Sequence, residues 1–240
     1  MKTTLLSFTF LLISIISTGQ CVEGDCQNGY GKEFTADYTY TGFYKDGKYH
    51  GFALIEFNNG NVFKGSFEEG QMNGVGIFTE NSGQRTTYAE YRDGELHGYS
   101  FVLEGGNVVE ANKYKKGKVS KAMELDYTNN VVNGNCRGNC MGGFGLEAYG
   151  ENDYYYGFFA SNAYTGVGIR IFPSGDIYKG GMKKSNREGF GEYNWPNGDV
   201  YIGMWNNNKR EGLGVFIYAD GREEIGLFKN DKYKGPVEDL

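Results

Sequence analysis

Residues 178–200 read YKGGMKKSNREGFGEYNWPNGDV, and residues 201–223 directly after them read YIGMWNNNKREGLGVFIYADGRE. If the first tyrosine of each segment is position 0, both segments have glycine at positions 2, 11, 13 and 20. Position 4 holds a large apolar residue, Met182 or Trp205. Chance does not keep this many positions in register, so the two segments are units of an internal repeat, and the repeat decides the fold.

The same spacing extends in both directions along the chain. Clear units begin at Tyr40, Phe63 and Tyr155, and weaker ones begin at Thr87 and Glu110. Unit starts fall at positions 40, 63, 87, 110, 132, 155, 178, 201 and 224, with steps of 22 to 24 residues. We therefore interpret the chain as one unbroken array. The glycines that define the repeat are Gly65, Gly74, Gly76, Gly157, Gly166, Gly168, Gly180, Gly189, Gly191, Gly203, Gly212 and Gly214.

Each unit also carries two turn signals. One is a pair such as Asp46-Gly47, and the other is a pair such as Asn197-Gly198. Such pairs supply the positive φ angles of tight hairpin turns, and the runs between them have strand composition. Two strands and two turns per unit predict a β-hairpin repeat. The expected fold is all-β: an elongated, single-layer antiparallel meander of about nine β-hairpin repeats.

The repeated glycines have a packing explanation. Positions 0, 2 and 4 of a strand point to the same face, so the pattern aromatic-glycine-aromatic leaves a gap beside each ring. We expect rings from adjacent units to lie over these gaps, because glycine permits close approach. The opposite face carries apolar pairs such as Val75 and Ile77, so the sheet should curl to bury part of it. Valine in place of Gly203 should therefore collide with a ring, whereas valine at Lys179, interpreted as solvent-facing, should not.

These features resemble the MORN repeats, a family built on the pattern Y-x-G-x-[WF] followed by G-x-G and a closing glycine. The resemblance covers residues 29–235 apart from the weak stretch 110–131. The departures from the pattern are Ala89 and Asn112 at the first glycine and Ala53 and Ser100 at the third. The resemblance implies an elongated, twisted sheet of hairpins that serves as an interaction module.

Cysteine occurs in two close pairs. The segments CVEGDC at 21–26 and CRGNC at 136–140 are each followed by glycines three and five residues after the last cysteine. We infer that a cysteine-containing opening unit was duplicated together with its array. The pairs are five units apart, roughly 48 Å in an open sheet, so one metal ion cannot join them. Local disulfides, Cys21–Cys26 and Cys136–Cys140, are favoured over free thiols. The opening unit resembles that of exported bacterial MORN proteins.

The first residues have the features of a signal peptide. Lys2 precedes an apolar run over 5–16, which is shorter than the roughly 20 residues of a transmembrane helix. We expect cleavage after Gly19, which leaves Gln20 as the N-terminus of an exported protein in the periplasm, on the cell surface or secreted. No transmembrane segment is then expected. An uncleaved anchor and lipid attachment at Cys21 are the alternatives.

The expected organisation therefore has five parts. They are a signal peptide at 1–19, a cysteine-containing opening unit at 20–39, a first array with a degenerate last unit at 40–131, a duplicated cysteine-containing unit at 132–154, and a second array with a C-terminal cap at 155–240.

No pattern in the sequence predicts catalysis, a metal site or a cofactor. The two histidines, His50 and His97, are two units apart, roughly 19 Å, so they cannot act as a pair. The formal net charge is −6, and Lys and Arg form no basic stripe, so nucleic acid is not an expected partner. We expect a protein that is not an enzyme.

Aromatic side chains are the remaining candidates for a site. The rings expected on one face are Tyr155, Tyr178, Tyr193, Trp195, Tyr201 and Trp205. They either pack between repeats or form an exposed stacking platform. The leading hypothesis is an exported repeat scaffold that binds a protein or peptide along its extended sheet. The alternative is a carbohydrate- or cell-envelope-binding module that uses the aromatic face.

Overall fold

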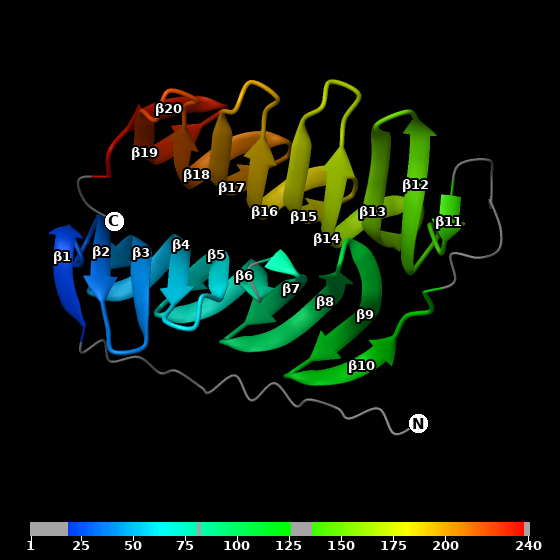
Figure 1. The fold of residues 1–240 in the computed structure, drawn as a ribbon, viewed down its shortest axis with the longest axis horizontal. Coiled ribbons are helices and arrows are strands. Elements are labelled where there is room, and N and C mark those ends of the chain that lie inside the picture. The colour runs from blue at the N-terminus through cyan, green and yellow to red at the C-terminus, as the bar shows by residue number, and fades with distance from the viewer. Residues whose placement is uncertain (1–18, 81–82, 126–135, 238–240) are drawn as a thin grey trace.

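The computed structural model describes residues 19–80, 83–125 and 136–237. Within these residues the chain forms no α-helix, and its strands make two antiparallel meanders of ten strands each (Figure 1). The first sheet contains, in spatial order, β1 (Gln20–Gly24), β2 (Tyr30–Phe34), β3 (Tyr38–Lys45), β4 (Lys48–Phe57), β5 (Val62–Glu68), β6 (Gln71–Glu80), β7 (Arg85–Arg92), β8 (Glu95–Glu104), β9 (Asn107–Lys115) and β10 (Lys118–Ala122). The second contains β11 (Cys136–Gly138), β12 (Phe144–Gly150), β13 (Asp153–Ala160), β14 (Ala163–Ile171), β15 (Ile177–Lys183), β16 (Asn186–Asn194), β17 (Val200–Asn206), β18 (Lys209–Ile217), β19 (Glu223–Lys229) and β20 (Lys232–Gly235).

The hairpin turns have the conformation that the sequence predicted. In the turn Asp46-Gly47 both residues have positive φ, 51° and 69°. The second sheet places non-glycine pairs at the same point of the repeat, such as Asn207-Asn208 with φ of 46° and 68°. Asparagine tolerates this left-handed region better than most residues, and paired positive φ angles match the twist of the flanking strands. The antiparallel meander of β-hairpin repeats is therefore confirmed.

The position-11 glycine lies in a β-bulge. Gly180 pairs with Gly191, but two residues further along β15 the partner of Met182 is Arg187, so β16 carries extra residues at this step. Gly189 lies within the step and has a φ of 71°, where other residues are strained. Bulges bend the strand and increase its twist. Their recurrence in successive units therefore explains the strong curvature of both sheets.

The position-0 ring lies over the glycines of its own unit. A Cβ added to Gly203 would lie 2.5 Å from the Cα of Gly214 and 2.7 Å from the hydroxyl oxygen of Tyr201, and a Cβ on Gly214 would also meet Tyr201. The Tyr201 hydroxyl donates a 3.0 Å hydrogen bond to the carbonyl of Met204. Equivalent bonds three residues along the chain are made by Tyr40, Tyr155 and Tyr178. The expectation that adjacent units supply the ring is thus corrected: the ring is local, because its hydroxyl binds a carbonyl of its own strand.

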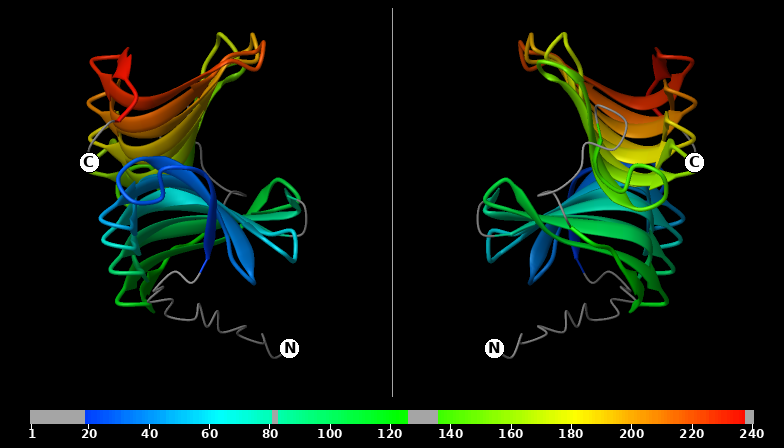
Figure 2. Two further views of the ribbon diagram at one scale, coloured as in Figure 1. Left: turned by 90° about the vertical axis from the view of Figure 1, so that its left-hand side faces the viewer. Right: turned by 90° about the vertical axis from the view of Figure 1, so that its right-hand side faces the viewer.

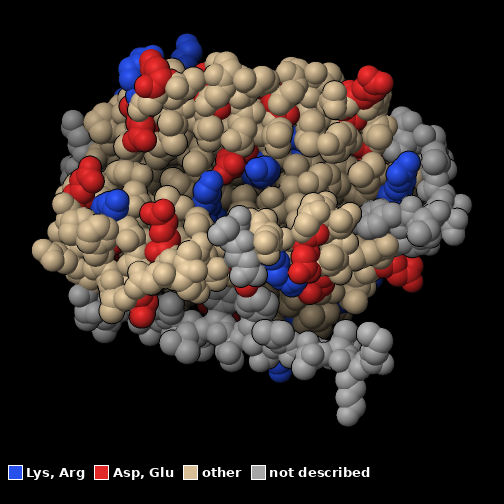
Figure 3. Space-filling view, viewed as in Figure 1, with Lys and Arg blue, Asp and Glu red and all other residues tan. Residues whose placement is uncertain are grey.

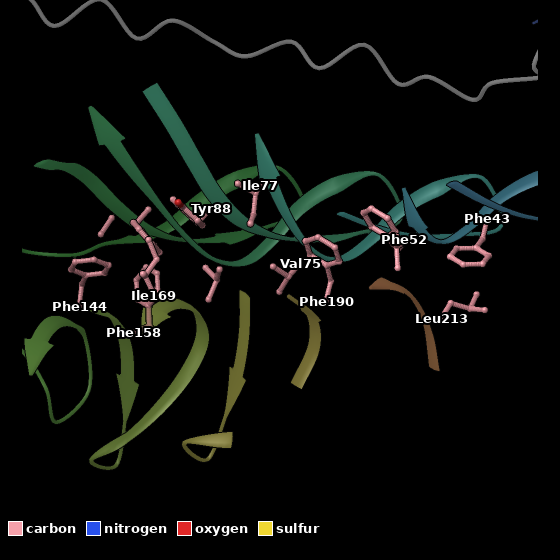
Figure 4. Close-up of a cluster of buried hydrophobic side chains, with 14 residues drawn as sticks. Phe43, Phe52, Val75, Ile77, Tyr88, Phe144, Phe158, Ile169, Phe190 and Leu213 are labelled. Atoms are coloured by element: carbon pink, nitrogen blue, oxygen red, sulfur yellow. The ribbon is translucent and has the colours of Figure 1, made fainter. Parts of the chain in front are cut away.

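The two sheets pack back to back. Each is curved, with its convex face against the other sheet and its concave face outward (Figure 2). Side chains from both convex faces point toward one another and form a shared core (Figure 4). Its buried members are Phe43, Phe52, Val75, Ile77, Tyr88, Phe101 and Ala111 from the first sheet, and Phe144, Phe158, Val167, Ile169, Phe190, Leu213 and Val215 from the second. The array therefore differs from the expected elongated single layer: it folds back on itself, because a face with this much apolar surface is stabilised by burial.

The second sheet runs along the first in the opposite direction, and the contacts obey a pseudo-two-fold axis. β4 packs against β17 and β18, β6 against β15 and β16, and β14 against β7 and β8. In the repeat, β4 is equivalent to β14, β6 to β16 and β7 to β17. A two-fold rotation therefore converts the β4–β17 contact into the β14–β7 contact and maps the β6–β16 contact onto itself. This is the arrangement of an isologous dimer within one chain, and it supports the proposal that one half arose by duplication of the other.

A carboxylate lies beside this axis. Glu192 on β16 forms an ion pair of 2.7 Å with Lys64 of the opposite sheet and one of 3.7 Å with Lys179 of its own sheet. The two lysines are equivalent under the axis, but the position equivalent to Glu192 is Ile77. Lys179 is therefore not the solvent-facing residue that the sequence suggested, since it faces the sheet interface. Because only the second sheet has a carboxylate at this position, the two convex faces differ in charge, and Glu192 of one sheet pairs with Lys64 of the other.

The predicted disulfides are confirmed. Cys21 and Cys26 are bonded with a Cα–Cα distance of 6.0 Å, and Cys136 and Cys140 with one of 6.2 Å. Each closes the loop at the start of its sheet, before β2 and β12. The expected signal peptide covers residues 1–19, of which residues 1–18 lie outside the described residues, and Gln20 begins β1. None of the described residues belongs to a helix that could span a membrane.

Candidate functional site

The concave faces are the outward surfaces on which the aromatic columns of the repeat lie. Each carries its own cluster of buried rings, separate from the core between the sheets. In the second sheet this cluster contains five of the six predicted rings as buried residues, Tyr155, Tyr178, Tyr193, Tyr201 and Trp205. The sixth, Trp195, is half-buried against them. The predicted rings therefore do share one face, but only Trp195 presents substantial surface to solvent.

Trp205 shows why these columns are packing elements. Its side chain is 4% exposed, and its indole N–H donates to the carbonyl of Gly191 at 3.2 Å. Its ring meets that of Tyr178 at a centroid distance of 5.5 Å and that of Tyr201 at 5.3 Å, both edge to face. The contact with Tyr178 joins neighbouring units and helps to hold the array together, whereas the contact with Tyr201 lies within one unit. A ligand stacking on Trp205 would have to displace them.

A second series of rings is more accessible. Phe172, Trp195 and Tyr218 occupy position 17 of three successive units, at the ends of β14, β16 and β18, and all three are half-buried. Tyr193 and Phe216, which are buried, fill the spaces between them. Each ring contacts the next one in the series. The centroid distances between consecutive rings are 5.9 Å for Phe172–Tyr193, 4.5 Å for Tyr193–Trp195, 5.3 Å for Trp195–Phe216 and 4.7 Å for Phe216–Tyr218. We call these five residues the ring belt.

Guanidinium groups pack against rings of the belt but leave Phe172, Trp195 and Tyr218 partly exposed. Arg187 lies 5.0 Å from the ring of Tyr193, and 4.3 Å from that of Trp205 beneath. Arg210 lies 5.2 Å from the ring of Phe216. These distances are those of cation–π pairs. Burial is the largest influence on the Arg187 guanidinium and lowers its pKa. Arg170 and Arg222 make equivalent contacts at the two ends of the belt, over Phe172 and Tyr218.

The C-terminal end of the belt borders an open hollow of about 560 Å³. Its lining residues are Trp195, Asp199, Arg210, Phe216, Tyr218, Glu224, Phe228, Asp231, Lys232 and Tyr233. Aromatic, cationic and anionic groups are thus mixed in one surface. The same mixture holds elsewhere, since acidic and basic side chains are interspersed on the face shown in Figure 3 without a patch of one sign. The chemistry of the hollow fits an extended ligand with both apolar and polar groups.

The first sheet lacks the ring belt. Position 17 there holds Phe57, Glu80 and Glu104 instead of three rings. Arg85 forms ion pairs with both carboxylates, at 3.5 Å to Glu80 and 3.3 Å to Glu104. Where the second sheet has its two central arginines, the first has Met72 and Leu96. Sequence reasoning missed this difference because it searched for columns shared by all units.

Buried phenols meet a carboxylate at the start of each concave face. The hydroxyls of Tyr44 and Tyr49 donate to Glu33 at 3.0 Å and 3.4 Å, and the hydroxyl of Tyr164 donates to Glu147 at 3.0 Å. Desolvation by burial, followed by the nearby acidic and phenolic groups, raises the pKa of Tyr44, Tyr49 and Tyr164 far above its ordinary value. These phenols therefore stay neutral at physiological pH and serve as hydrogen-bond donors.

The histidines do not form a site. His50 is half-buried beside the bulge of β4, and its Nδ1 is buried without a hydrogen-bond partner. Burial, with Lys45 nearby, lowers its pKa. His97 lies on β8, four strands further along the sheet. Among the described residues, no group of three or more His, Cys, Asp or Glu side chains is placed to hold a metal ion.

Comparison with known proteins identifies the repeat. A family model for the MORN repeat matches residues 40–62, 63–85, 155–177, 178–200 and 201–221. These matches fall in both sheets, and the chain belongs to the MORN-repeat proteins. MORN repeats generally form scaffolds that bind proteins or membranes, and they are typically not enzymes. No curated protein matches the chain.

Two solved structures show a distant resemblance. One is the TCP domain of Drosophila melanogaster SAS-4 in complex with a proline-rich motif of Ana2, with 9% identity, 90% of this chain and 93% of that chain covered, and a TM-score of 0.26. The other is the wild-type TCP10 domain of Danio rerio CPAP, with 15% identity, coverage of 92% and 99%, and a TM-score of 0.24. At these scores neither resemblance bears on the function of this chain.

Proposed function

We propose that this chain is an exported, non-enzymatic repeat scaffold that binds a protein or peptide on the concave face of its second sheet. The observation that carries the proposal is the ring belt, in which Phe172, Trp195 and Tyr218 stay partly exposed while the neighbouring columns are buried. Trp195 and Tyr218 also line the open hollow. A repeat that needs rings only for packing has no reason to leave these three accessible. Their accessibility is explained if a partner covers them.

The composition of this surface favours a protein or peptide partner. Aromatic residues and arginine are enriched in protein interfaces and contribute most of the binding energy there. Trp195 and Arg210 lie together in the hollow with Asp231, so the surface can match apolar groups, carbonyls and charges of both signs. The hollow is open and is lined by residues of three successive repeat units, which suits an extended chain better than a small molecule.

Export is supported by the two disulfides. Both pairs are bonded, and disulfides of this kind persist in oxidising compartments. The proposed signal peptide precedes the first pair directly. After its removal, β1 with Cys21 would form the N-terminal edge of the mature protein, held to β2 by the pairing of Cys21 with Glu33.

Site-specific photo-crosslinking in the native host tests the proposal. A photoreactive residue replaces Trp195 on the belt or, as a matched control, Phe57 at the same repeat position on the first concave face. We expect a discrete crosslinked protein from position 195 and none from position 57. Equal crosslinking from both positions, or none from either, would contradict the assignment of the second face.

A glycan array separates the alternative function. Carbohydrate binding that is lost in Trp195→Ala and retained in Phe57→Ala would favour an envelope-binding module over a protein scaffold. Trp205 is not a suitable probe for this test, because its ring is buried and its loss would disturb the repeat itself. The scaffold proposal predicts no glycan signal that depends on Trp195.

A further inference from the structure

The three half-exposed rings of the belt form a ladder with a regular spacing. Phe172, Trp195 and Tyr218 follow β14, β16 and β18, so consecutive rings are two strands apart. At about 4.8 Å per strand, the rings repeat every ~9.6 Å along the array.

This spacing selects among the regular conformations of a bound peptide. A helix presents one face every ~5.4 Å, and a β-strand presents the same face every ~6.7 Å. Neither period places successive side chains on successive rings. A polyproline II helix has three residues per turn and a rise of ~3.1 Å, which gives a repeat of ~9.3 Å. Every third residue of such a peptide would meet the next ring of the ladder.

We propose that the ring belt binds a proline-rich segment of its partner in the polyproline II conformation. This rests on the proposed function and names its ligand class. Prolines at every third position of the peptide contact successive partly exposed rings, one proline per ring. The buried rings Tyr193 and Phe216 form the floor between these contacts. Aromatic-lined surfaces suit this conformation because the proline peptide is already ordered before it binds.

The polar groups of the belt complement the same ligand. A polyproline II backbone makes no internal hydrogen bonds, so its carbonyls need donors from water or from the partner. Arg187 and Arg210 lie over Tyr193 and Phe216, and Arg210 is also 5.9 Å from the ladder ring of Trp195. One N–H of each guanidinium donates to a carbonyl of this chain, that of Asn208 or Asp231, and the other N–H groups are the donors for the peptide carbonyls. The first concave face has Met72 and Leu96 at these positions, so it offers neither the ladder nor the donors.

The ladder fixes the length of the ligand. Three rings at a three-residue spacing are spanned by seven residues, whereas four residues reach only two rings. Isothermal titration of the intact mature protein with acetylated, amidated oligoprolines of four, seven and ten residues tests this prediction. A Gly-Ser peptide of ten residues serves as the flexible control.

We expect the seven-proline peptide to bind about tenfold more tightly than the four-proline peptide, which corresponds to one additional ring contact. The ten-proline peptide should bind within about twofold of the seven-proline peptide. Tyr218→Ala should remove the gain from four to seven residues, and Trp195→Ala should weaken all three by about tenfold or more. Phe57→Ala on the first concave face should leave every affinity unchanged.

Two results would overturn the inference. One is binding that rises steadily with length or is unchanged in Trp195→Ala. The other is no oligoproline binding while the photoreactive residue at position 195 still captures a partner, in which case the second concave face binds a peptide of another conformation. Absence of both oligoproline binding and crosslinking at position 195 contradicts the proposed function itself.

Discussion

The two concave faces of this protein are built from the same repeat and differ in what they expose. Both have a position-0 ring over bare glycines, and in both the rings behind it are buried. They differ at positions 9 and 17 of the central units. The first face has Met72, Leu96, Glu80 and Glu104 where the second has Arg187, Arg210, Trp195 and Tyr218.

This difference distinguishes the residues that determine the fold from the residues that are available for binding. The glycines and the position-0 rings recur in most units of both sheets, because they determine how the strands bend and pack, and the unit with Thr87 and Ala89 is an exception. Positions 9 and 17 border solvent, so their side chains can change without altering the fold. In the first sheet the two carboxylates share Arg85 as their ion-pair partner. In the second, the same positions form the ring belt.

Valine at the position-2 glycine should have the largest effect on stability, and the effect should be similar in both sheets. A Cβ at Gly203 meets the backbone of Gly214 at 2.5 Å, and one at Gly65 meets the ring of Phe63 at 2.6 Å. Overpacking against backbone cannot be relieved by a side-chain rotation, so we expect a loss of about 3 kcal/mol for each variant in urea denaturation. Glu56→Val, at an exposed position of β4, should change stability by about 0.5 kcal/mol or less. Unchanged midpoints for Gly203→Val would show that this column does not serve ring packing.

Alanine at the position-11 glycines should separate backbone strain from packing between the sheets. Gly51, Gly166 and Gly189 have similar φ angles of 61°, 66° and 71°, so each variant carries the cost of a positive φ. A Cβ at Gly51 would also meet Leu213 of the opposite sheet, and one at Gly166 would meet Tyr99, whereas none of the surrounding atoms lies within 4 Å at Gly189.

We therefore expect Gly189→Ala to cost about 1 kcal/mol, and Gly51→Ala and Gly166→Ala to cost about 1–2 kcal/mol more because of overpacking. Thermal denaturation of the three variants measures the difference. Equal losses at all three positions would argue against contact between the convex faces at these two sites.

The carboxylate beside the pseudo-two-fold axis should make the sheet interface sensitive to acid. Burial by itself would raise the pKa of Glu192, but the nearby Lys64, Asn194 and Lys179 together lower it below its ordinary value. A lowered folded-state pKa contributes stability that is complete above the unfolded value of about 4.3 and is lost as the pH falls through the folded value.

Glu192→Gln should therefore destabilise the protein by about 1 kcal/mol at pH 7, and its stability should converge with that of the wild type below about pH 4. Urea denaturation over the range from pH 7 to pH 3 measures this gap. A gap that stays constant with pH would show that the charge of Glu192 does not stabilise the interface.

A small effect on stability is also expected at the belt itself. Trp195 is half-buried, so Trp195→Ala should cost about 1 kcal/mol, whereas Trp205→Ala removes a buried ring and should cost about 3 kcal/mol or more. Thermal denaturation distinguishes the two. If Trp195→Ala is as damaging as Trp205→Ala, the belt is a packing element and its accessibility has no functional meaning.

The sequence contains enough information to place the hairpins but not the sheets. Gly203 and its equivalents set the register, because a missing side chain at a fixed spacing has few explanations. The apolar residues Val75 and Ile77 show that a face is buried, but they do not show what covers it, and here the cover lies more than 90 residues away in the sequence. The pairing of Lys179 with Glu192 depends on that same long-range contact.

The ring belt was only partly predictable. Trp195 was among the candidate residues. Repeat spacing does not show whether a repeated position is buried or accessible, so the sequence could not distinguish Trp195 from Trp205. Phe172 and Tyr218 were not selected, because position 17 varies between units. A comparison of the two halves position by position would have found them, since the variable positions mark what distinguishes one face from the other.

Small-angle X-ray scattering of the mature protein tests the back-to-back arrangement most directly. Two sheets of ten strands each that are packed along their convex faces should give a radius of gyration of about 17–20 Å, close to that of a compact chain of this size. The same twenty strands in one open layer would extend over about 96 Å at 4.8 Å per strand. A compact scattering curve is the result that the structure predicts, and a rod-like curve with a maximum dimension near 100 Å would contradict it.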